Sequence, residues 1–473
     1  MNPDQEKNLF ENAPVGKAIA KMALPTVIGQ IILVLYNMAD TFFIGLTGDD
    51  AKVTALTICM PAFMLLSAIS NLFGVGGASV ISRAYGCKNE KSARAASSFA
   101  LWGCIGTTMA YALLASGFGD ALIDLLGGTA AGVHAYALQY MRITVIAGGM
   151  GASVSGLLSH LIRAEGRGME ASLGIALGGL LNIALDPLFM FVLCAPGREI
   201  EGAAMATAIS NFLSLLFFVV VLAKRRRVSM LTFSPRYMRT EGLTIRNVLS
   251  TGLPACIMTL FENVSFAVME KLLSAYGILV QAGIGVAKKV NMLAHSIVRG
   301  MAQGTLPLIG YNYACGNHDR MKHTALSSMA LSVASASICM AVCLLFSRPL
   351  IGLFLQEGTM SAEYGAAFLR IMCIGGPFSA CAYSCISLFQ ATGSGDKAFL
   401  LAILRKGVLD IPLMFMLDRV LPIWGAPIAT PVADGVCCLC AAVLCTRFFL
   451  AFEQPERRTF HGQNGYLSLH KAD

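Results

Sequence analysis

Apolar residues in this chain form long runs that are separated by short polar segments. Residues 101–118 and 326–346 contain no charged side chain, and each run approaches the roughly 20 residues that a helix needs to cross a lipid bilayer. The pattern therefore predicts an all-α polytopic membrane protein. We expect twelve transmembrane helices, over residues 17–46, 52–82, 95–118, 133–162, 170–194, 201–223, 248–276, 280–311, 324–346, 362–391, 398–417 and 424–450.

The sequence pattern repeats at about half the length of the chain. The segment YMRI at 140–143 returns as FLRI at 368–371, and GAAMAT at 202–207 returns as GAPIAT at 425–430. The offsets are 228 and 223 residues, so the six spans of one half correspond to the six of the other. Two like halves leave a cleft between them, which transporters use. We divide the chain into an N-lobe at 1–223, a basic cytoplasmic linker at 224–247, a C-lobe at 248–450 and a cytoplasmic tail at 451–473.

Composition agrees with a chain that is solvated mostly by lipid. The 473 residues are 56% hydrophobic and only 13% charged, with a mean hydropathy of +0.67, whereas soluble domains carry about 25% charged residues. The net charge of +8 does not indicate a nucleic-acid partner, because the basic residues are concentrated in particular loops. The fifteen cysteines lie mostly within predicted spans without the spacing of metal ligands, so we expect no metal centre and no cofactor.

The placement of charge in the loops predicts the orientation in the membrane. Lysine and arginine are concentrated after even-numbered spans, above all in the KRRR segment at 224–227, while Asp49 and Asp120 lie in odd-numbered loops. Cytoplasmic loops carry an excess of basic residues. We therefore expect both termini in the cytoplasm.

Two aspartates inside predicted spans are the main candidates for function. Asp40 lies in the first span and Asp186 in the fifth, and Asn182 shares a helix face with Asp186 because the spacing is i, i+4. A charge at the centre of a membrane helix costs on the order of 2.5–3.5 kcal/mol on insertion scales. Such carboxylates could take up and release a proton or coordinate a hard cation such as sodium. The alternative is a pair that only holds helices together.

Other acidic residues and two prolines remain open to both interpretations. Glu262 is equally compatible with a functional and a structural role, whereas Asp410 and Asp434 are more typical of structural residues. Glu270 and the adjacent Lys271 predict an ion pair, and Arg405 with Lys406 is expected near a cytoplasmic end. Pro25 and Pro254 occupy equivalent places, 229 residues apart, and proline kinks a helix, so each is either a hinge or a static kink.

These motifs together resemble those of a known transporter family. The first span contains Leu24-Pro25, Gln30, Tyr36-Asn37, Asp40 and Phe43-Ile44-Gly45, and the segment QGTLPLIGYNY at 303–313 corresponds to 74–86 in the first half. In order, spacing and duplication they resemble the MATE (multidrug and toxic compound extrusion) antiporters, most closely the MepA-like bacterial branch. The resemblance implies a MATE/MOP flippase-like fold of two six-helix bundles around a V-shaped central cavity.

The same resemblance implies a function and its residues. It implies export of amphipathic, often cationic, organic compounds in exchange for H⁺ or Na⁺ by alternating access. The protein would be a monomer whose partners are the small substrate and the bilayer. The implied ion-coupling residues, which would also hold any Na⁺, are Asp40, Asn182, Asp186 and Thr207; the implied cavity residues are Gln30, Tyr36, Asn37, Glu262 and Phe266; the implied hinges are Pro25 and Pro254. Where the sodium-coupled branch has a second C-lobe acid this chain has Ser387, so we place coupling in the N-lobe.

Other classes of membrane protein fit the sequence less well. A flippase for lipid-linked oligosaccharides or precursors, from the same superfamily, remains the alternative, although the charged candidates inside the predicted spans are mostly acidic. A major-facilitator carrier would have a Gly-x-x-x-Asp-Arg-x-Gly-Arg loop after span 2, where this chain has SRAYGCKN at 82–89. The histidines lack HExxH spacing and nothing resembles a channel filter, so we expect neither an enzyme nor a channel.

Overall fold

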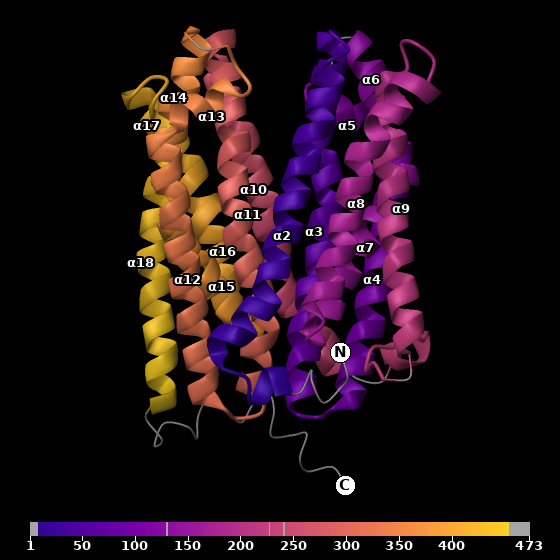
Figure 1. The fold of residues 1–473 in the computed structure, drawn as a ribbon, viewed down its shortest axis with the longest axis vertical. Coiled ribbons are helices and arrows are strands. Elements are labelled where there is room, and N and C mark those ends of the chain that lie inside the picture. The colour runs from indigo at the N-terminus through magenta and orange to yellow at the C-terminus, as the bar shows by residue number, and fades with distance from the viewer. Residues whose placement is uncertain (1–7, 129–130, 227, 240–241, 357, 454–473) are drawn as a thin grey trace.

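The regular elements of this protein are helices that stand in two upright bundles (Figure 1). The structure, a computed structural model, describes residues 8–128, 131–226, 228–239, 242–356 and 358–453, and every regular element within those ranges is helical. The predicted tail at 451–473 lies outside the described residues except for its first three positions. The all-α prediction is confirmed.

The N-lobe is the bundle built from the first half of the chain. Its helices are α2 (Val15–Gly45), α3 (Asp50–Gly86), α4 (Glu90–Gly117), α5 (Gly119–Leu125), α6 (Ala131–Met141), α7 (Gly149–Ala164), α8 (Gly168–Leu188) and α9 (Glu199–Arg225). Two π-helical turns, Arg142–Ala147 and Phe189–Leu193, follow α6 and α8. A short 3₁₀ helix, Pro235–Arg239, lies in the linker.

The C-lobe repeats this order of elements. Its helices are α10 (Gly242–Ser274), α11 (Ile278–Ala314), α12 (His318–Leu345), α13 (Ser347–Gly352), α14 (Met360–Cys373), α15 (Gly376–Ala391), α16 (Gly395–Ile403), α17 (Ile411–Val420) and α18 (Gly425–Glu453). The π-helical turn Leu404–Asp410 joins α16 to α17. A short helix follows α4 in one lobe and α12 in the other, so the internal repeat seen in the sequence extends to the small elements.

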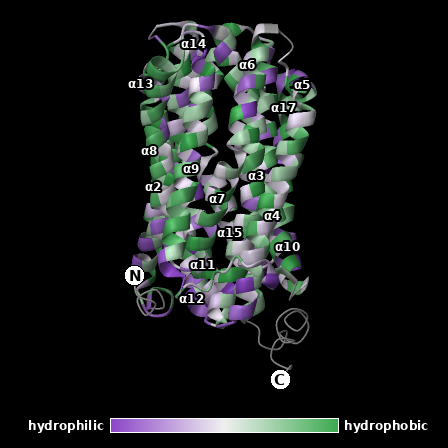
Figure 2. Cartoon of the chain, turned by 90° about the vertical axis from the view of Figure 1, so that its right-hand side faces the viewer, coloured by the Kyte–Doolittle hydropathy of each residue, from purple (hydrophilic) through white to green (hydrophobic). Residues whose placement is uncertain are grey.

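Most of the predicted spans meet a simple test of length and hydropathy. Eight described helices are long and apolar enough to cross a membrane, and two bent pairs, α6 with α7 (48°) and α14 with α15 (45°), bring the number to ten. The two remaining predicted spans are α11, which carries Lys288, Lys289 and Arg299, and the broken α16–α17 segment. Figure 2 shows hydrophobic residues along the middle of the bundle and hydrophilic residues gathered at its ends.

The two lobes meet along α3 with α10 and α2 with α11. The contact is close enough to exclude side chains: a Cβ atom at Gly76 would overlap the carbonyl of Val248, and one at Gly304 would overlap the backbone of Ala23. Gly76 and Gly304 are 228 residues apart, so the two halves of the interface are built alike. Both chain termini lie at the same end of the two bundles, which we call the terminal end (Figure 1). These contacts lie in the half of the molecule nearest that end.

An N-terminal strap, residues 8–13, crosses from the N-lobe to the C-lobe at the terminal end. Phe10 is fully buried and its ring stacks on Tyr311, with ring centroids 4.7 Å apart. Arg320 of α12 donates hydrogen bonds to the carbonyl oxygens of Phe10 (2.8 Å) and Ala13 (2.6 Å). The strap therefore adds a polar and aromatic fastening to the helix contacts between the lobes.

Candidate functional site

The four predicted ion-coupling residues come together inside the N-lobe. Asp40 is supplied by α2, Asn182 and Asp186 by α8, and Thr207 by α9, and none of their side chains is more than slightly exposed. Close packing of α2 on α8 makes this possible: a Cβ atom at Gly179 would lie 2.8 Å from Ile32 Cγ2. We call these four residues the N-lobe cluster.

The polar atoms of the N-lobe cluster contact one another directly. The Asn182 amide donates hydrogen bonds to Asp186 Oδ1 and to Thr207 Oγ1, each at 3.3 Å. The carboxyl group of Asp40 lies against that of Asp186. The prediction that these two aspartates face one another, rather than the lipid, therefore agrees with the geometry.

The composition of the N-lobe cluster suits a proton or a small cation. Among the described residues, Asp40 Oδ1, Asp186 Oδ2 and Asn182 Oδ1 have no hydrogen-bond partner, and neither aspartate is in an ion pair with lysine, arginine or histidine. Two ionised carboxylates side by side in a buried site repel one another strongly. A shared proton, or a hard cation bound by these oxygens, would relieve the repulsion.

Two tyrosines lie beside the N-lobe cluster, and the sequence analysis placed only one of them near function. Tyr36 is buried close to Asp40, so it lies beside this cluster rather than between the lobes, where the resemblance had placed it. Tyr140, from α6, is also buried near Asp40. Tyr140 begins the YMRI segment that marked the internal repeat. Its position opposite a buried acid could not be found from that pattern.

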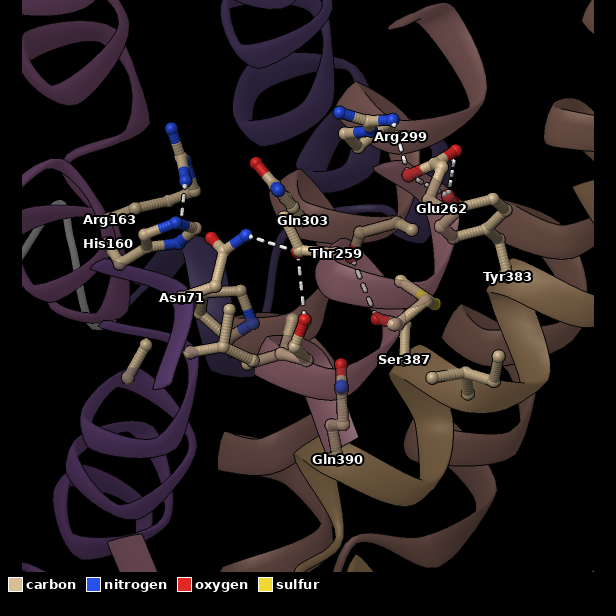
Figure 3. Close-up of a pocket in the computed structure, with 18 residues that line it drawn as sticks. Asn71, His160, Arg163, Thr259, Glu262, Arg299, Gln303, Tyr383, Ser387 and Gln390 are labelled. Carbon is tan, nitrogen blue, oxygen red and sulfur yellow. Dashed lines mark hydrogen bonds and ion pairs between the residues drawn. The ribbon is translucent and has the colours of Figure 1, made fainter. Parts of the chain in front are cut away.

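A second polar site, the central pocket, lies between the lobes (Figure 3). It contains about 670 Å³ of space that atoms do not fill, part of it open to solvent. Its polar lining from the N-lobe is Asn71, His160 and Arg163, and from the C-lobe Thr259, Glu262, Arg299, Gln303, Tyr383, Ser387 and Gln390. The Asn71 amide donates to Thr259 Oγ1 at 2.9 Å, which joins the two lobes across the pocket.

Most of the predicted cavity residues do not line this pocket. Glu262 lines the pocket, and Gln30 lies next to it because its amide donates to Gln303 Oε1 at 3.4 Å. Asn37 binds the carbonyl of Leu33 in its own helix (2.7 Å). Phe266 lies on α10, and the centre of its ring is 5.2 Å from Nζ of Lys288.

Glu262 differs from the N-lobe aspartates because its charge is compensated. It accepts a hydrogen bond at 3.0 Å in its ion pair with Arg299, and Tyr383 donates to it at 3.2 Å. Ser387, at the position of the missing acid, donates to the carbonyl of Ala302 (2.8 Å). These contacts do not form a two-carboxylate site.

Ion pairs account for the remaining acids that the sequence singled out. Glu270 is paired, but its partner is Lys288 on α11 (3.0 Å) rather than the adjacent Lys271. Asp410 pairs with Lys406 and Asp434 with Arg405, each at 2.7 Å and each fully or almost fully buried. Arg405 and Lys406 thus lie inside the C-lobe rather than at its end. The helices α2 and α10 continue through Pro25 and Pro254, and the hinge role of these prolines stays a prediction.

Comparison with known proteins decides the family. The MatE family model matches residues 25–188 and 254–416, one match in each lobe. The chain belongs to the MATE family. The two six-helix bundles that were predicted from the sequence are thereby confirmed, as is a multi-pass membrane transporter.

Curated relatives and solved structures match nearly the whole chain. The multidrug export protein MepA of Staphylococcus aureus (strain MRSA252) is 28% identical over 442 residues, which cover 93% of this chain and 96% of that protein. MepA of Staphylococcus haemolyticus is 26% identical over 438 residues, covering 93% and 95%. The structure described as "Outward-facing conformation of a multidrug resistance MATE family transporter of the MOP superfamily" has a TM-score of 0.86 at 22% identity, covering 94% of this chain and 98% of that one.

Proposed function

We propose that this protein exports amphipathic, often cationic, organic compounds from a bacterial cell in exchange for H⁺ or Na⁺. The observation that carries the proposal is the buried Asp40–Asp186 pair, which has no fixed cation among the described residues. Two MepA relatives described as multidrug export proteins match the chain over almost its full length. The central pocket offers a place for the exported compound, with polar groups from both lobes around it.

Helix α2 connects the ion site to the boundary between the lobes. Asp40 lies near one end of α2, while Gln30 and the segment around Ala23 contact α11 of the other lobe. Binding of an ion at Asp40 would change how α2 packs on α8 and therefore on α11. A ligand shifts such an equilibrium only through its different affinities for the two states, so ion and substrate would favour opposite arrangements of the lobes.

The proposed orientation places the terminal end of the bundle in the cytoplasm. Basic residues are concentrated in the loops of that end, as the positive-inside rule requires of cytoplasmic loops. The close helix contacts and the N-terminal strap also lie there. The described arrangement would accordingly be closed toward the cytoplasm, and alternating access would require these contacts to separate. The transporter would act as a monomer in the inner membrane.

Transport by purified protein in proteoliposomes tests the proposal. Uptake of ethidium is measured with a proton gradient and, separately, with a sodium gradient, for the wild-type protein and for Asp40→Asn and Asp186→Asn. We expect one gradient to drive uptake and both variants to lose it. The matched control is Asp120→Asn, an exposed acid of α5, which should transport normally. Undiminished transport by both N-lobe variants would exclude these aspartates from coupling.

A further inference from the structure

The C-lobe contains a counterpart of the N-lobe cluster, with two substitutions that change its charge. The internal repeat relates the lobes by offsets of 223 to 229 residues. In both lobes, corresponding helices pack together: α2 on α8, and α10 on α16 with the π-helical turn that follows it. Equivalent positions are Asp40 and Met269, Asn182 and Lys406, Asp186 and Asp410, and Thr207 and Thr430.

The main contact of the N-lobe cluster is repeated in this counterpart, although the threonine has a different partner: Thr207 accepts from Asn182, whereas Thr430 donates to Asp410. In the N-lobe, the Asn182 amide donates to Asp186 one helical turn away. In the C-lobe, the Lys406 ammonium donates to Asp410 Oδ2 at 2.7 Å, again one turn away. Thr430 Oγ1 donates to the other oxygen of Asp410 at 3.0 Å. The same three helix positions are therefore used in both lobes, with a cation in place of a neutral amide.

The two sites differ in formal charge. The N-lobe cluster has two carboxyl groups and no fixed cation among the described residues, so its formal charge is −2 when both are ionised. Its counterpart has one carboxylate and one ammonium, since Met269 replaces the first aspartate, and its formal charge is zero. Buried charge is strongly unfavourable unless it is paired. The N-lobe site thus requires an exchangeable cation, whereas the C-lobe site contains its own.

Asp410 is held by fixed donors at both of its carboxylate oxygens. Ser265 Oγ donates to Asp410 Oδ2 at 2.6 Å, so that both carboxylate oxygens are engaged by donors from three helical segments. Lys406 and Asp410 are 3% and 0% exposed, so the pair is almost completely shielded from bulk solvent. The pair is fixed within a π-helical turn, an irregularity that is frequent at functional positions.

The charged groups next to this pair are also compensated. Arg405 donates to Asp434 Oδ1 and to Ser379 Oγ, each at 2.7 Å, and its guanidinium lies 4.5 Å from the centre of the Tyr383 ring. Glu262 is paired with Arg299. The described acids in this part of the C-lobe therefore each have a fixed cation.

We propose that Lys406 is a tethered cation that permanently fills the C-lobe counterpart of the ion site, so that ion exchange is confined to the N-lobe. The inference rests on the proposed function for the identity of the N-lobe site. It assigns Lys406 a positioning role: its ammonium takes the place that an exchangeable ion would occupy beside Asp410. Each transport cycle would accordingly use a single ion site.

The decisive experiment moves ion binding from one lobe to the other. Asp40→Asn/Asp186→Asn protein is compared with the same protein that also carries Met269→Asp/Lys406→Asn. Bound ions are counted with radioactive sodium and by proton uptake after a jump to mildly acidic pH. We expect the first protein to lose the ion that the wild type binds and the second to regain it in full. A control with Met269→Asn/Lys406→Arg in the same background keeps the tethered charge paired with Asp410 and should regain nothing.

A stability measurement keeps the proposal falsifiable if the combined variants fold poorly. Lys406→Asn alone leaves Asp410 buried without its cation, so its Tm should fall at alkaline pH and recover with acid or sodium, because a bound ion stabilises the folded state. Lys406→Arg and the double variant Lys406→Asn/Asp410→Asn should keep a Tm close to that of the wild type, since neither contains an uncompensated charge.

The outcomes separate the two proposals. The tethered-cation proposal is wrong if folded Met269→Asp/Lys406→Asn protein binds no additional ion, or if Lys406→Asn has the wild-type Tm at every pH. If wild-type protein transports ethidium with neither gradient, the proposed function fails. The comparison of Lys406→Asn with Lys406→Arg still decides the inference in that case, because it measures the folded protein without transport.

Discussion

Gln30 of α2 donates a side-chain hydrogen bond to Gln303 of α11, across the boundary between the two lobes, at 3.4 Å. The bond lies between the N-lobe cluster and the close backbone contacts of the terminal end, on the helix that also carries Asp40. It is therefore placed to transmit a change at the N-lobe cluster to the position of the opposite lobe.

Removal of this bond should weaken the closed arrangement. A net hydrogen bond contributes about 0.5–1.5 kcal/mol, so Gln303→Ala should shift the balance between closed and separated lobes by roughly two- to tenfold. Spin labels on the exposed residues Leu46 and Ile278, in a cysteine-free background, report the distance between the lobes at the far end. We expect a larger short-distance population in the variant. An unchanged distance distribution would contradict the expectation.

Thr207 should strengthen ion binding without being essential to it. Its hydroxyl accepts from Asn182, which also binds Asp186. Thr207→Val keeps the shape and leaves the amide with one fewer partner, at a cost of about 1–2 kcal/mol. The ion concentration for half-maximal transport should rise roughly five- to thirtyfold. Thr57→Val, in which an exposed hydroxyl that binds Val53 is lost, serves as the control and should leave this concentration unchanged.

The Glu262–Arg299 pair should behave as one unit. Loss of either partner leaves an unpaired charge in the central pocket. Because Arg299 is one-third exposed (34%), the free energy of unfolding should fall by about 1–3 kcal/mol, less than for a fully buried pair. Thermal unfolding of Glu262→Gln, Arg299→Met and the double variant measures this. Each single variant should have a lower Tm, and the double variant should recover most of the loss. Additive losses would show that the two side chains act independently.

The N-terminal strap should detach when Arg320 is removed. Its guanidinium donates to the carbonyls of Phe10 and Ala13, and bonds from a charged donor contribute about 1.5–3 kcal/mol each. Arg320→Ala should therefore accelerate hydrogen exchange across residues 8–13 by at least tenfold. Arg348→Ala, an exposed arginine of α13 in the same lobe, should leave that exchange rate unchanged.

The sequence predicted the helices and the two aspartates of the N-lobe cluster for clear physical reasons, whereas Thr207 was implied only by the family resemblance. Long uncharged runs have no stable alternative to a membrane helix, and a carboxylate such as Asp186 within one of them is too costly to be incidental. The bends between α6 and α7 and between α14 and α15 could not be predicted, since hydropathy alone does not reveal a change of helix direction. Hydropathy also does not reveal which acidic residues are paired with a lysine or arginine.

The C-lobe shows this limit most clearly. Lys406 and Asp410 are spaced i, i+4, a pairing visible in the sequence, but the basic residues suggested the end of a span. Only the packing of the surrounding helices shows that the pair is buried. Likewise, the pairing of Glu262 with Arg299 joins residues 37 positions apart, and no local pattern indicates it.

The glycine contacts between α3 and α10 have a consequence for leakage. Because Gly76 and Gly252 bring main chain against main chain, the seal at that end does not depend on side chains that change rotamer from moment to moment. Such a seal gives way only when whole helices move. The uncoupled leak of protons and sodium ions between turnovers should therefore be small, so the ion gradient is dissipated slowly.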